Sequence, residues 1–466
     1  MKPSLLQLLR CPYCHGEVAI SHEARRQGEA LLDGVLACKG CLHRFPVVAG
    51  IPIIVGEHEY IDVKAETRAG SLFQGPSSRE VIKLLQSGAW ARAFEVLINP
   101  PTSKIDLPLV DRLAQLPLVG ALARYARWKT ATAAAPHWRK RFLRDLEALG
   151  ERATAMKVLK LYYDGWYKQE LMNYFMYRFA QPRHLVALSL ASVLTQHRGP
   201  VLDVACGVGH LTHYLSSPPH SLPVVGLDRN FFQLYIARSY VAPQADFICC
   251  PADGPLPFAA GVFGGILCSD AFHYFLEKKR CAVELQRILD ADGTIVITRV
   301  GNLAVKPNEG YELLPEGYRQ LFAPMAQAMV TEETILQRYL RRLGPALSSS
   351  APAAELRQSK WLSFVATNDP RVLREHGEFA AWPHGCGRLQ INPLYAGTPD
   401  DQGVTYRFRF PSQHYAKEDQ AMRSYAPNEI RLSRSALDSL HAREPAPEIG
   451  DLIRQCAIVG MPERYM

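Results

Sequence analysis

The chain has no long hydrophobic run and no large excess of one charge. Its most apolar stretch, Leu185–Leu194, is ten residues long, which is too short for a membrane-spanning helix. The first residues, MKPSLLQLLRCPYC, lack the apolar core of a secretory signal. The net charge of +8 over 466 residues permits an anionic partner without requiring one. Together these absences predict a cytoplasmic protein with no membrane span.

The cysteines do not form the pattern of a disulfide framework. There are eleven of them, an odd number, and without an export signal metal binding is the favoured interpretation. Cys11 and Cys14 form one CxxC pair, Cys38 and Cys41 form another, and 23 residues separate the pairs. Four thiolates at this spacing complete a tetrahedral shell that suits a structural zinc ion. Since that shell is full, the nearby histidines are predicted to be surface residues, namely His15 and His43.

The residues around these pairs carry a family resemblance. LLQLLRCPYCHGEV and LACKGCLHRFPVVAGIPIIV resemble the small zinc-ribbon family of tRNA-methyltransferase activators over about 50 residues. Members of that family commonly sit beside a methyltransferase and steady it or its substrate site. The resemblance therefore implies a zinc ribbon fused in cis to such an enzyme, with a separate partner protein bound through the ribbon as an alternative.

A glycine-containing turn follows an apolar strand near residue 200. PVLDVACGVGHLTHYL predicts a strand over Val201–Val204, then a turn, then a helix. Small residues at Ala205, Gly207 and Gly209 let a ligand approach the backbone closely. The dinucleotide fingerprint is not met, because neither possible frame supplies its third glycine. What remains is an acid at the strand end, Asp203, followed by Gly-x-Gly.

This pattern resembles the class I S-adenosylmethionine-dependent methyltransferases over roughly Pro200–Val300, including later strand-like segments such as PVVGLD and GGILCS. The resemblance implies that Asp203 meets the methionine end of S-adenosylmethionine. It also implies that Asp228, 25 residues further on, accepts hydrogen bonds from the ribose hydroxyls. The other predicted cofactor-binding residues are Ala205, Gly207, Gly209, Arg229, Asp253, Ser269 and Tyr177.

The predicted architecture is α/β. It combines a Rossmann-like class I methyltransferase sheet with an N-terminal zinc ribbon, a helical insertion and a small α+β C-terminal segment. Within the insertion, helical spacing predicts one helix over Ser78–Ile98, ended by Pro100–Pro101. The predicted ranges are 1–58 for the ribbon, 59–181 for a helical lid or substrate-binding region, 182–369 for the cofactor domain and 370–466 for the C-terminal segment.

Two candidate catalytic residues follow the fourth predicted strand of this domain. SDAFHYF contains Asp270 and His273, at the point where the fold brings substrate to cofactor. An imidazole with an ordinary pKa near 6.5 can take a proton from an acceptor hydroxyl. The alternatives are a packed histidine at a helix start and an acid that caps a helix or lies in a loop.

The sequence before the cofactor loop is rich in aromatic residues. At helical spacing such residues are more often core than cofactor cage. In related enzymes, helices before the first strand form a lid over the methyl donor. The residues chosen to line such a lid are Tyr177 and Arg178.

Positive charge gathers in one stretch. Residues 124–160 contain ten Lys or Arg and three Asp or Glu, which leaves +7. A basic helical face of this kind either binds the phosphates of RNA or is simply solvated. The first hypothesis for the whole chain is a methyltransferase that acts on a small molecule at an O or N atom, with natural-product biosynthesis as its context. The second is an RNA methyltransferase, acting on rRNA or tRNA, and the third is a non-catalytic scaffold or activator.

Overall fold

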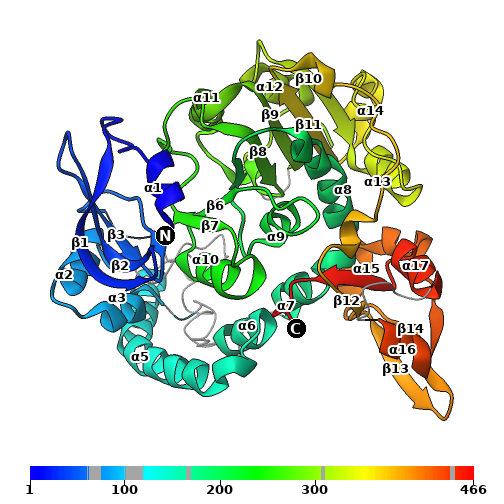
Figure 1. The fold of residues 1–466 in the computed structure, drawn as a ribbon, viewed down its shortest axis with the longest axis horizontal. Helices are drawn as coiled ribbons and strands as arrows, with labels where there is room; N and C mark the ends of the chain where they lie inside the picture. Colours follow the sequence, from blue (N-terminus) through cyan, green and yellow to red (C-terminus); the bar gives the residue numbers. More distant parts are fainter. Residues whose placement is uncertain are drawn as a thin grey trace.

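The computed structural model describes residues 1–59, 61, 75–98, 100, 119–163, 169–305, 310–440 and 447–466. Figure 1 shows the N-terminal ribbon on one side of a central sheet and the C-terminal strands on the other. The ribbon has these elements: α1 (Pro3–Leu8), β1 (Val18–Gln27), β2 (Ala30–Cys38), β3 (Arg44–Val48) and β4 (Ile51–Pro52). Its four strands form one antiparallel sheet in the order β1-β2-β3-β4.

The central sheet has seven strands in the order β10-β11-β9-β8-β5-β6-β7. Their bounds are β5 (Val201–Val204), β6 (Val224–Asp228), β7 (Asp246–Cys249), β8 (Phe263–Ser269), β9 (Leu289–Gly301), β10 (Ala326–Thr331) and β11 (Trp361–Thr367). The strands from β5 to β9 run parallel, whereas β11 is antiparallel to both of its neighbours. The chain reverses its direction of travel across the sheet between β5 and β8, which places the topological switch point there.

Both faces of this sheet are covered, and alternate strand residues enter two different cores. Val201 and Leu267 pack among residues of α8 (Pro182–Ala191), α9 (His210–Ser216) and α10 (Phe231–Ile236). Leu202 and Ile266 face the other way, toward α11 (Lys278–Ile288), α12 (Pro315–Leu321), α14 (Ala353–Gln358) and the ribbon. The run Leu185–Leu194 forms α8 and the following turn, whose apolar residues are buried as predicted.

The ribbon continues the edge of the central sheet. Ile53 makes a parallel bridge to Cys249 at the end of β7, and the backbone N–H of Ile54 donates to the Cys249 carbonyl at 2.8 Å. A second backbone contact lies directly before the first cysteine pair, where the Arg10 N–H donates to the Pro257 carbonyl between β7 and β8 at 2.9 Å. Because ribbon and sheet also share one hydrophobic core, the predicted boundary at residue 58 separates elements that pack as one body.

The helical insertion departs from the predicted single helix. Ser78–Ile98 forms α2 (Ser78–Gln86) and α3 (Trp90–Leu97), with a break at Gly88, whose φ is +78°. A left-handed residue ends a helix and is tolerated there because glycine lacks Cβ. Pro100 follows the second helix, and Pro101 lies outside the described residues. The described residues before α8 also form α5 (Gly120–Leu149), α6 (Ala155–Tyr163) and α7 (Gln169–Met176).

The C-terminal segment is α+β, as predicted. β12 (Arg388–Ile391) pairs with β16 (Ile458–Met461), and β13 (Tyr395–Asp400), β14 (Gly403–Phe408) and β15 (Glu429–Ser433) form a three-stranded sheet. Its described residues also form α15 (Gln413–Glu418), α16 (Arg434–Ser439) and α17 (Pro447–Arg454), whereas α13 (Glu332–Leu340) lies between β10 and β11 of the central sheet. Near the chain end, the fully buried Tyr465 hydroxyl donates to the Phe175 carbonyl and contacts His210 Nε2, each at 2.7 Å.

Candidate active site and metal centre

The loop after β5 has the backbone conformation that a closely bound ligand needs. Ala205, Gly207 and Gly209 all have positive φ, of 56°, 55° and 81°. For alanine this left-handed conformation costs about 1–2 kcal/mol. A Cβ on Gly209 would lie 3.1 Å from the Ala237 side chain, so the loop is also packed closely against the π-helical turn that follows α10. The loop stands at the carboxyl end of β5, beside the switch point where open α/β sheets bind ligands.

Asp203 lies under this loop and is only 2% exposed. Its Oδ2 accepts a hydrogen bond from the Thr212 hydroxyl at 2.6 Å. Burial raises the pKa of the Asp203 carboxyl to about 7, although the Thr212 hydrogen bond opposes the rise. A carboxyl in this state responds to any positive charge placed nearby, because a cation favours its ionised form.

Asp228 ends β6 and connects the two neighbouring strand ends. Its Oδ2 accepts from the Gly207 N–H at 3.0 Å, and its Oδ1 accepts from the Asn230 N–H at 2.8 Å. Burial raises the pKa of Asp228 despite these hydrogen bonds. Each carboxylate oxygen retains further capacity to accept, so the group fits the paired hydroxyls of a ribose.

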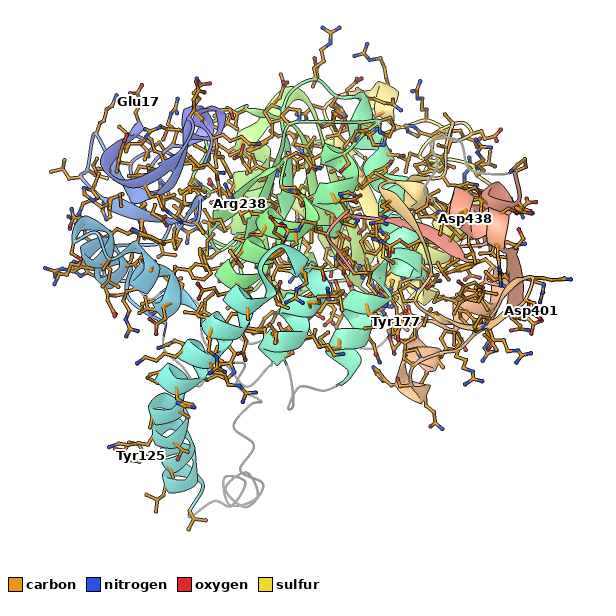
Figure 2. The ribbon with its side chains drawn as sticks, turned by 60° about the horizontal axis from the view of Figure 1, so that its bottom comes forward. Glu17, Tyr125, Tyr177, Arg238, Asp401 and Asp438 are labelled. Carbon is orange, nitrogen blue, oxygen red and sulfur yellow. The ribbon has the colours of Figure 1, made fainter. Side chains whose placement is uncertain are left out.

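The other predicted cofactor residues are placed less closely together. Arg229 is exposed beside Asp228, and Asp253 lies half-buried in the turn region after β7. Ser269 ends β8, where its hydroxyl accepts from Thr298 at 2.8 Å. Tyr177 follows α7 and lies edge-on to Tyr415, with ring centroids 5.6 Å apart; Figure 2 labels it. We call Asp203, the loop 205–209 and Asp228 the cofactor half of the site.

Asp270 belongs to the second half of the site, in which the candidate catalytic residues lie. It follows β8 with φ of +56° and is surrounded by arginines. Asp270 Oδ1 lies 3.1 Å from Arg299 Nε, and Oδ2 lies 3.7 Å from Arg178 Nη1 and 3.9 Å from Arg183 Nη1. Burial alone would raise the pKa of Asp270, but the three arginine charges outweigh it and lower the pKa. Asp270 is therefore ionised at neutral pH and poorly suited to accept a proton.

His273 lies one turn further along and is 1% exposed. Neither ring nitrogen has a hydrogen-bond partner among the described residues. The ring lies against Trp361, with centroids 5.7 Å apart. Burial lowers the pKa of His273, although the charge of Asp270 acts in the opposite direction. The imidazole is thus neutral at pH 7 and has a free lone pair, which is what a general base requires.

We call Arg178, Arg183, Asp270, His273 and Arg299 the acceptor half of the site, and sequence reasoning missed two of these five residues. Arg183 and Arg299 were not among the candidates. They come from α8 and from a φ-positive position in β9. The one available signal was an arginine following the apolar run of β9, since buried arginines almost always have partners.

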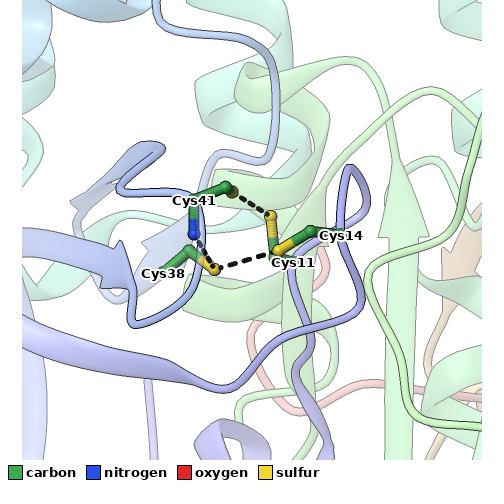
Figure 3. A group of neighbouring side chains, drawn as sticks. All are labelled: Cys11, Cys14, Cys38 and Cys41. Carbon is green, nitrogen blue, oxygen red and sulfur yellow. Dashed lines mark hydrogen bonds between the residues drawn. The ribbon is translucent and has the colours of Figure 1, made fainter.

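The four predicted zinc ligands come together in the ribbon (Figure 3). The Sγ atoms of Cys11, Cys14, Cys38 and Cys41 all lie within 4.8 Å of one another. The Cys11–Cys41 and Cys14–Cys38 Sγ distances are 3.5 and 3.4 Å, close to the ~3.8 Å edge of a tetrahedron with ~2.3 Å zinc–sulfur bonds. They are far longer than the ~2.05 Å of a disulfide. The donor set therefore fits zinc.

The two histidines of the ribbon differ from each other. His15 is exposed, as predicted, whereas His43 is half-buried. His43 stacks on Tyr13 with ring centroids 4.4 Å apart, and its Nδ1 lies 3.2 Å from Cys41 Sγ. A nitrogen at hydrogen-bonding distance from a ligating sulfur orients that ligand, a role common around metal sites.

The basic stretch lies mainly on α5. Figure 2 shows the N-terminal part of this helix, around Tyr125, extending away from the body of the molecule. Lys140, Arg141 and Arg144 are exposed. Arg139 instead turns inward and donates to the Ile98 carbonyl at 2.8 Å, and burial lowers its pKa. The side chains of Arg124 and Arg127 lie outside the described set.

An open groove of about 1420 Å³ lies elsewhere, in the C-terminal segment. Trp382, Arg388 and Leu389 are among its lining residues. None of the predicted site residues lines it, so its size does not make it a candidate for methyl transfer. Among the described residues no helix combines the length and the apolarity needed to cross a bilayer.

Two family models match the chain. The methyltransferase domain model matches residues 202–297, which contain the whole cofactor half, and the Trm112p-like protein model matches residues 2–50, which contain all four cysteines of the cluster. The chain combines a methyltransferase domain with a Trm112p-like domain. The central sheet is accordingly of the class I methyltransferase type, with an N-terminal cysteine cluster that fits a zinc ribbon.

One curated relative is a malonyl-(acyl-carrier protein) O-methyltransferase of Legionella pneumophila, 26% identical over 102 residues. The match spans 22% of this chain and 36% of that protein. Among solved structures, a plantazolicin methyltransferase in complex with SAH is 16% identical, with 49% of this chain and 99% of that one covered at a TM-score of 0.33. A complex containing the Haloferax volcanii Trm112 methyltransferase activator matches at 18% identity, covering 41% and 92%, with a TM-score of 0.30.

Proposed function

We propose that the chain is an S-adenosylmethionine-dependent methyltransferase that binds its methyl donor at the carboxyl ends of β5 and β6. The observation that carries this proposal is the Asp228 carboxylate, held by the Gly207 N–H of the loop after β5 at 3.0 Å. The carboxylate and the loop together offer acceptors for a ribose and a close approach to the backbone. The methyltransferase domain match over residues 202–297 supports the same assignment.

The donor brings a methyl group on a sulfonium, which is already activated. The protein's own task is to hold an acceptor atom in line with that methyl group and to exclude water. The acceptor's lone pair forms the new bond to carbon as the carbon–sulfur bond breaks, and the sulfur keeps the bonding electrons. Where the acceptor carries a proton, we assign its removal to neutral His273, and we give Asp270 the role of fixing nearby charges.

The favoured acceptor is a small molecule, at an O or N atom, with natural-product biosynthesis as a suitable context. The buried character of Arg178, His273 and Arg299, each at most 5% exposed, supports a narrow site. The lid assignment of Tyr177 and Arg178 belongs to this proposal. A cytoplasmic location stays a prediction from the sequence.

RNA is the second candidate acceptor, because the exposed Lys140, Arg141 and Arg144 on α5 provide a basic surface.

We propose that the zinc ribbon acts within its own chain. Its β4 edge is used by β7 of the same chain through the Ile53–Cys249 bridge, so it supports the cofactor domain in cis rather than a separate partner. A silent scaffold is the third candidate.

The test uses the protein with S-adenosylmethionine labelled in its methyl group. Host RNA, host protein and a host small-molecule extract are offered in separate tubes. We expect label in the small-molecule fraction, with the H273N variant as the negative control. Label in RNA instead would support the α5 surface as a binding site. Absence of label in every fraction, with donor still bound, would favour the scaffold.

A further inference from the structure

Three guanidinium groups converge on one carboxylate in the acceptor half. Arg178 precedes α8, Arg183 lies at its start, and Arg299 belongs to β9, so the cluster is assembled from separate elements. Arg178 and Arg299 are 4% and 5% exposed. Arginine is rarely buried to this extent without a dedicated partner.

The partners present do not satisfy this cluster. Within the described part of the chain, the buried Nε–H groups of Arg178, Arg183 and Arg299 donate no hydrogen bond. Arg299 Nε does form an ion pair with Asp270 Oδ1 at 3.1 Å, but without the geometry of a hydrogen bond. The 3.7 and 3.9 Å separations from Arg178 and Arg183 to Asp270 exceed the ~2.7–2.9 Å of a charge-assisted hydrogen bond. A buried donor without an acceptor costs about 1–3 kcal/mol, so the cluster has capacity for another acceptor.

Countercharges explain how the cluster folds without that acceptor. Besides Asp270, Asp419 lies 3.5 Å from Arg183, and Glu332 pairs with Arg299. Three acids therefore balance three arginines. Trp361 adds a packed face, with its ring centroid 4.0 Å from the Arg299 guanidinium carbon. The charges are neutralised, but the hydrogen bonds are not complete.

The cluster also has the right position for an acceptor. Asp270 directly follows β8, and β8 pairs with β5, whose end carries the cofactor loop. His273, whose two ring nitrogens make no hydrogen bond to the residues that the structure describes, lies three residues after Asp270. An oxyanion held by the arginines would therefore lie beside the proposed base and on the acceptor side of the methyl donor.

We propose that the acceptor substrate carries a carboxylate or phosphate group, which Arg178, Arg183 and Arg299 bind next to His273. Planar guanidinium forks match both of these oxyanions, often with two hydrogen bonds each. This inference rests on the proposed methyltransferase function and names the substrate class of the same site. It predicts that neutral molecules are poor acceptors.

The test measures thermal midpoints of the full chain saturated with S-adenosylhomocysteine. Acetate and methyl phosphate are titrated separately against chloride at matched ionic strength. We expect a saturable rise in the midpoint with at least one of them, because ligands that bind the native state stabilise it. The more effective anion identifies the carboxylate or the phosphate as the group recognised.

Variants connect the effect to the cluster. D270N removes the competing carboxylate charge, so we expect the anion to bind roughly tenfold more tightly. R183Q removes one guanidinium and should weaken the anion roughly tenfold; it decides the matter if D270N does not fold. D400N is the matched control, because Asp400 also pairs with an arginine, Arg431, at 2.7 Å, but this pair is exposed and lies in the C-terminal segment. We expect D400N to bind the anion like the wild type.

The outcomes separate the two proposals. If S-adenosylhomocysteine binds but neither anion raises the midpoint above the chloride reference, the substrate class is wrong and the methyltransferase proposal stands. An anion effect that is equal in the wild type, D270N and R183Q also overturns the assignment to this cluster. If S-adenosylhomocysteine itself does not bind, the methyltransferase proposal fails.

Discussion

The cofactor half and the acceptor half lie at the same edge of one sheet, but their polar groups are satisfied in different ways. In the cofactor half, Asp203 and Asp228 accept hydrogen bonds from Thr212, Gly207 and Asn230 at 2.6–3.0 Å. In the acceptor half, three arginine Nε atoms and both ring nitrogens of His273 are buried and make no hydrogen bond to any described residue, although Arg299 Nε forms an ion pair with Asp270. The polar groups of the cofactor half already have partners within the protein. Those of the acceptor half need a bound substrate to supply hydrogen-bond acceptors for the arginines and a proton for His273.

This difference separates what each half contributes. Partners already in place mean that the cofactor half is organised before any ligand arrives, so its residues should control donor affinity. Buried groups without partners raise the energy of the empty acceptor half and are satisfied when substrate binds. Its residues should therefore control turnover and the choice of acceptor. Each prediction below breaks or sharpens this division.

The largest effect is expected from the zinc ribbon, which borders the cofactor half through β7. Replacing Cys38 and Cys41 by serine should release about one equivalent of zinc and destabilise the ribbon, because structural zinc contributes folding free energy directly. Donor affinity should fall with it, since β7 pairs with β6, which ends at Asp228. Metal analysis and thermal unfolding measure the change.

The control for this change is C386S, which alters a cysteine outside the cluster. Its zinc content should equal that of the wild type. Unchanged zinc content in the double serine variant would refute the metal assignment.

The next largest effect is expected in the acceptor half. H273N keeps a polar side chain but removes the base, so the rate of methyl transfer should fall about 10²- to 10⁴-fold. The affinity for S-adenosylhomocysteine should stay within about twofold, because His273 belongs to the other half. Because burial holds the pKa of His273 below its usual value, the wild-type rate should be level between pH 7 and 8. A normal rate in H273N would remove His273 from the mechanism.

A smaller effect is expected at Asp228. D228A should weaken S-adenosylhomocysteine by about 1–3 kcal/mol, because ribose hydroxyls would lose their acceptor. D246N serves as the control, because Asp246 lies at the opposite end of the neighbouring strand β7. Calorimetric titration gives both affinities, and equal affinities would place the ribose elsewhere.

The smallest effect is a fraction of a proton at Asp203. Burial raises its pKa to about 7, so the carboxyl is partly protonated at pH 7. The ammonium group of bound S-adenosylmethionine would favour the ionised form of the Asp203 carboxyl, so binding of the donor should release protons. The binding enthalpy, measured in buffers of different ionisation enthalpy, should show a release of less than one proton. Proton uptake on binding, or the same release in D203N, would contradict this assignment.

The sequence was informative where the chemistry is local. Asp203, Gly207 and Asp228 belong to two adjacent strand–turn units, and the four cysteines belong to two CxxC turns, so spacing alone brings each set together. The acceptor half is different. Arg183 and Arg299 both reach Asp270 because α8 packs against β9, and no local pattern encodes that packing.

Two other features of the structure were not predicted from the sequence, for related reasons. The break between α2 and α3 depends on one glycine inside an otherwise periodic pattern, where a single residue gives a weak signal. The pairing of Ile53 with Cys249 depends on how the ribbon docks against β7. The residues of one strand do not determine this docking or its register.

The most direct test of this division is the binding of S-adenosylhomocysteine to four proteins, measured by calorimetry: wild type, D228A, H273N and D270N. The account predicts one site per chain in the wild type, a loss of roughly 5- to 150-fold in D228A, and affinities within about twofold of the wild type in the two acceptor-half variants. Absence of binding to the wild type, or a loss in H273N and D270N as large as that in D228A, would contradict it.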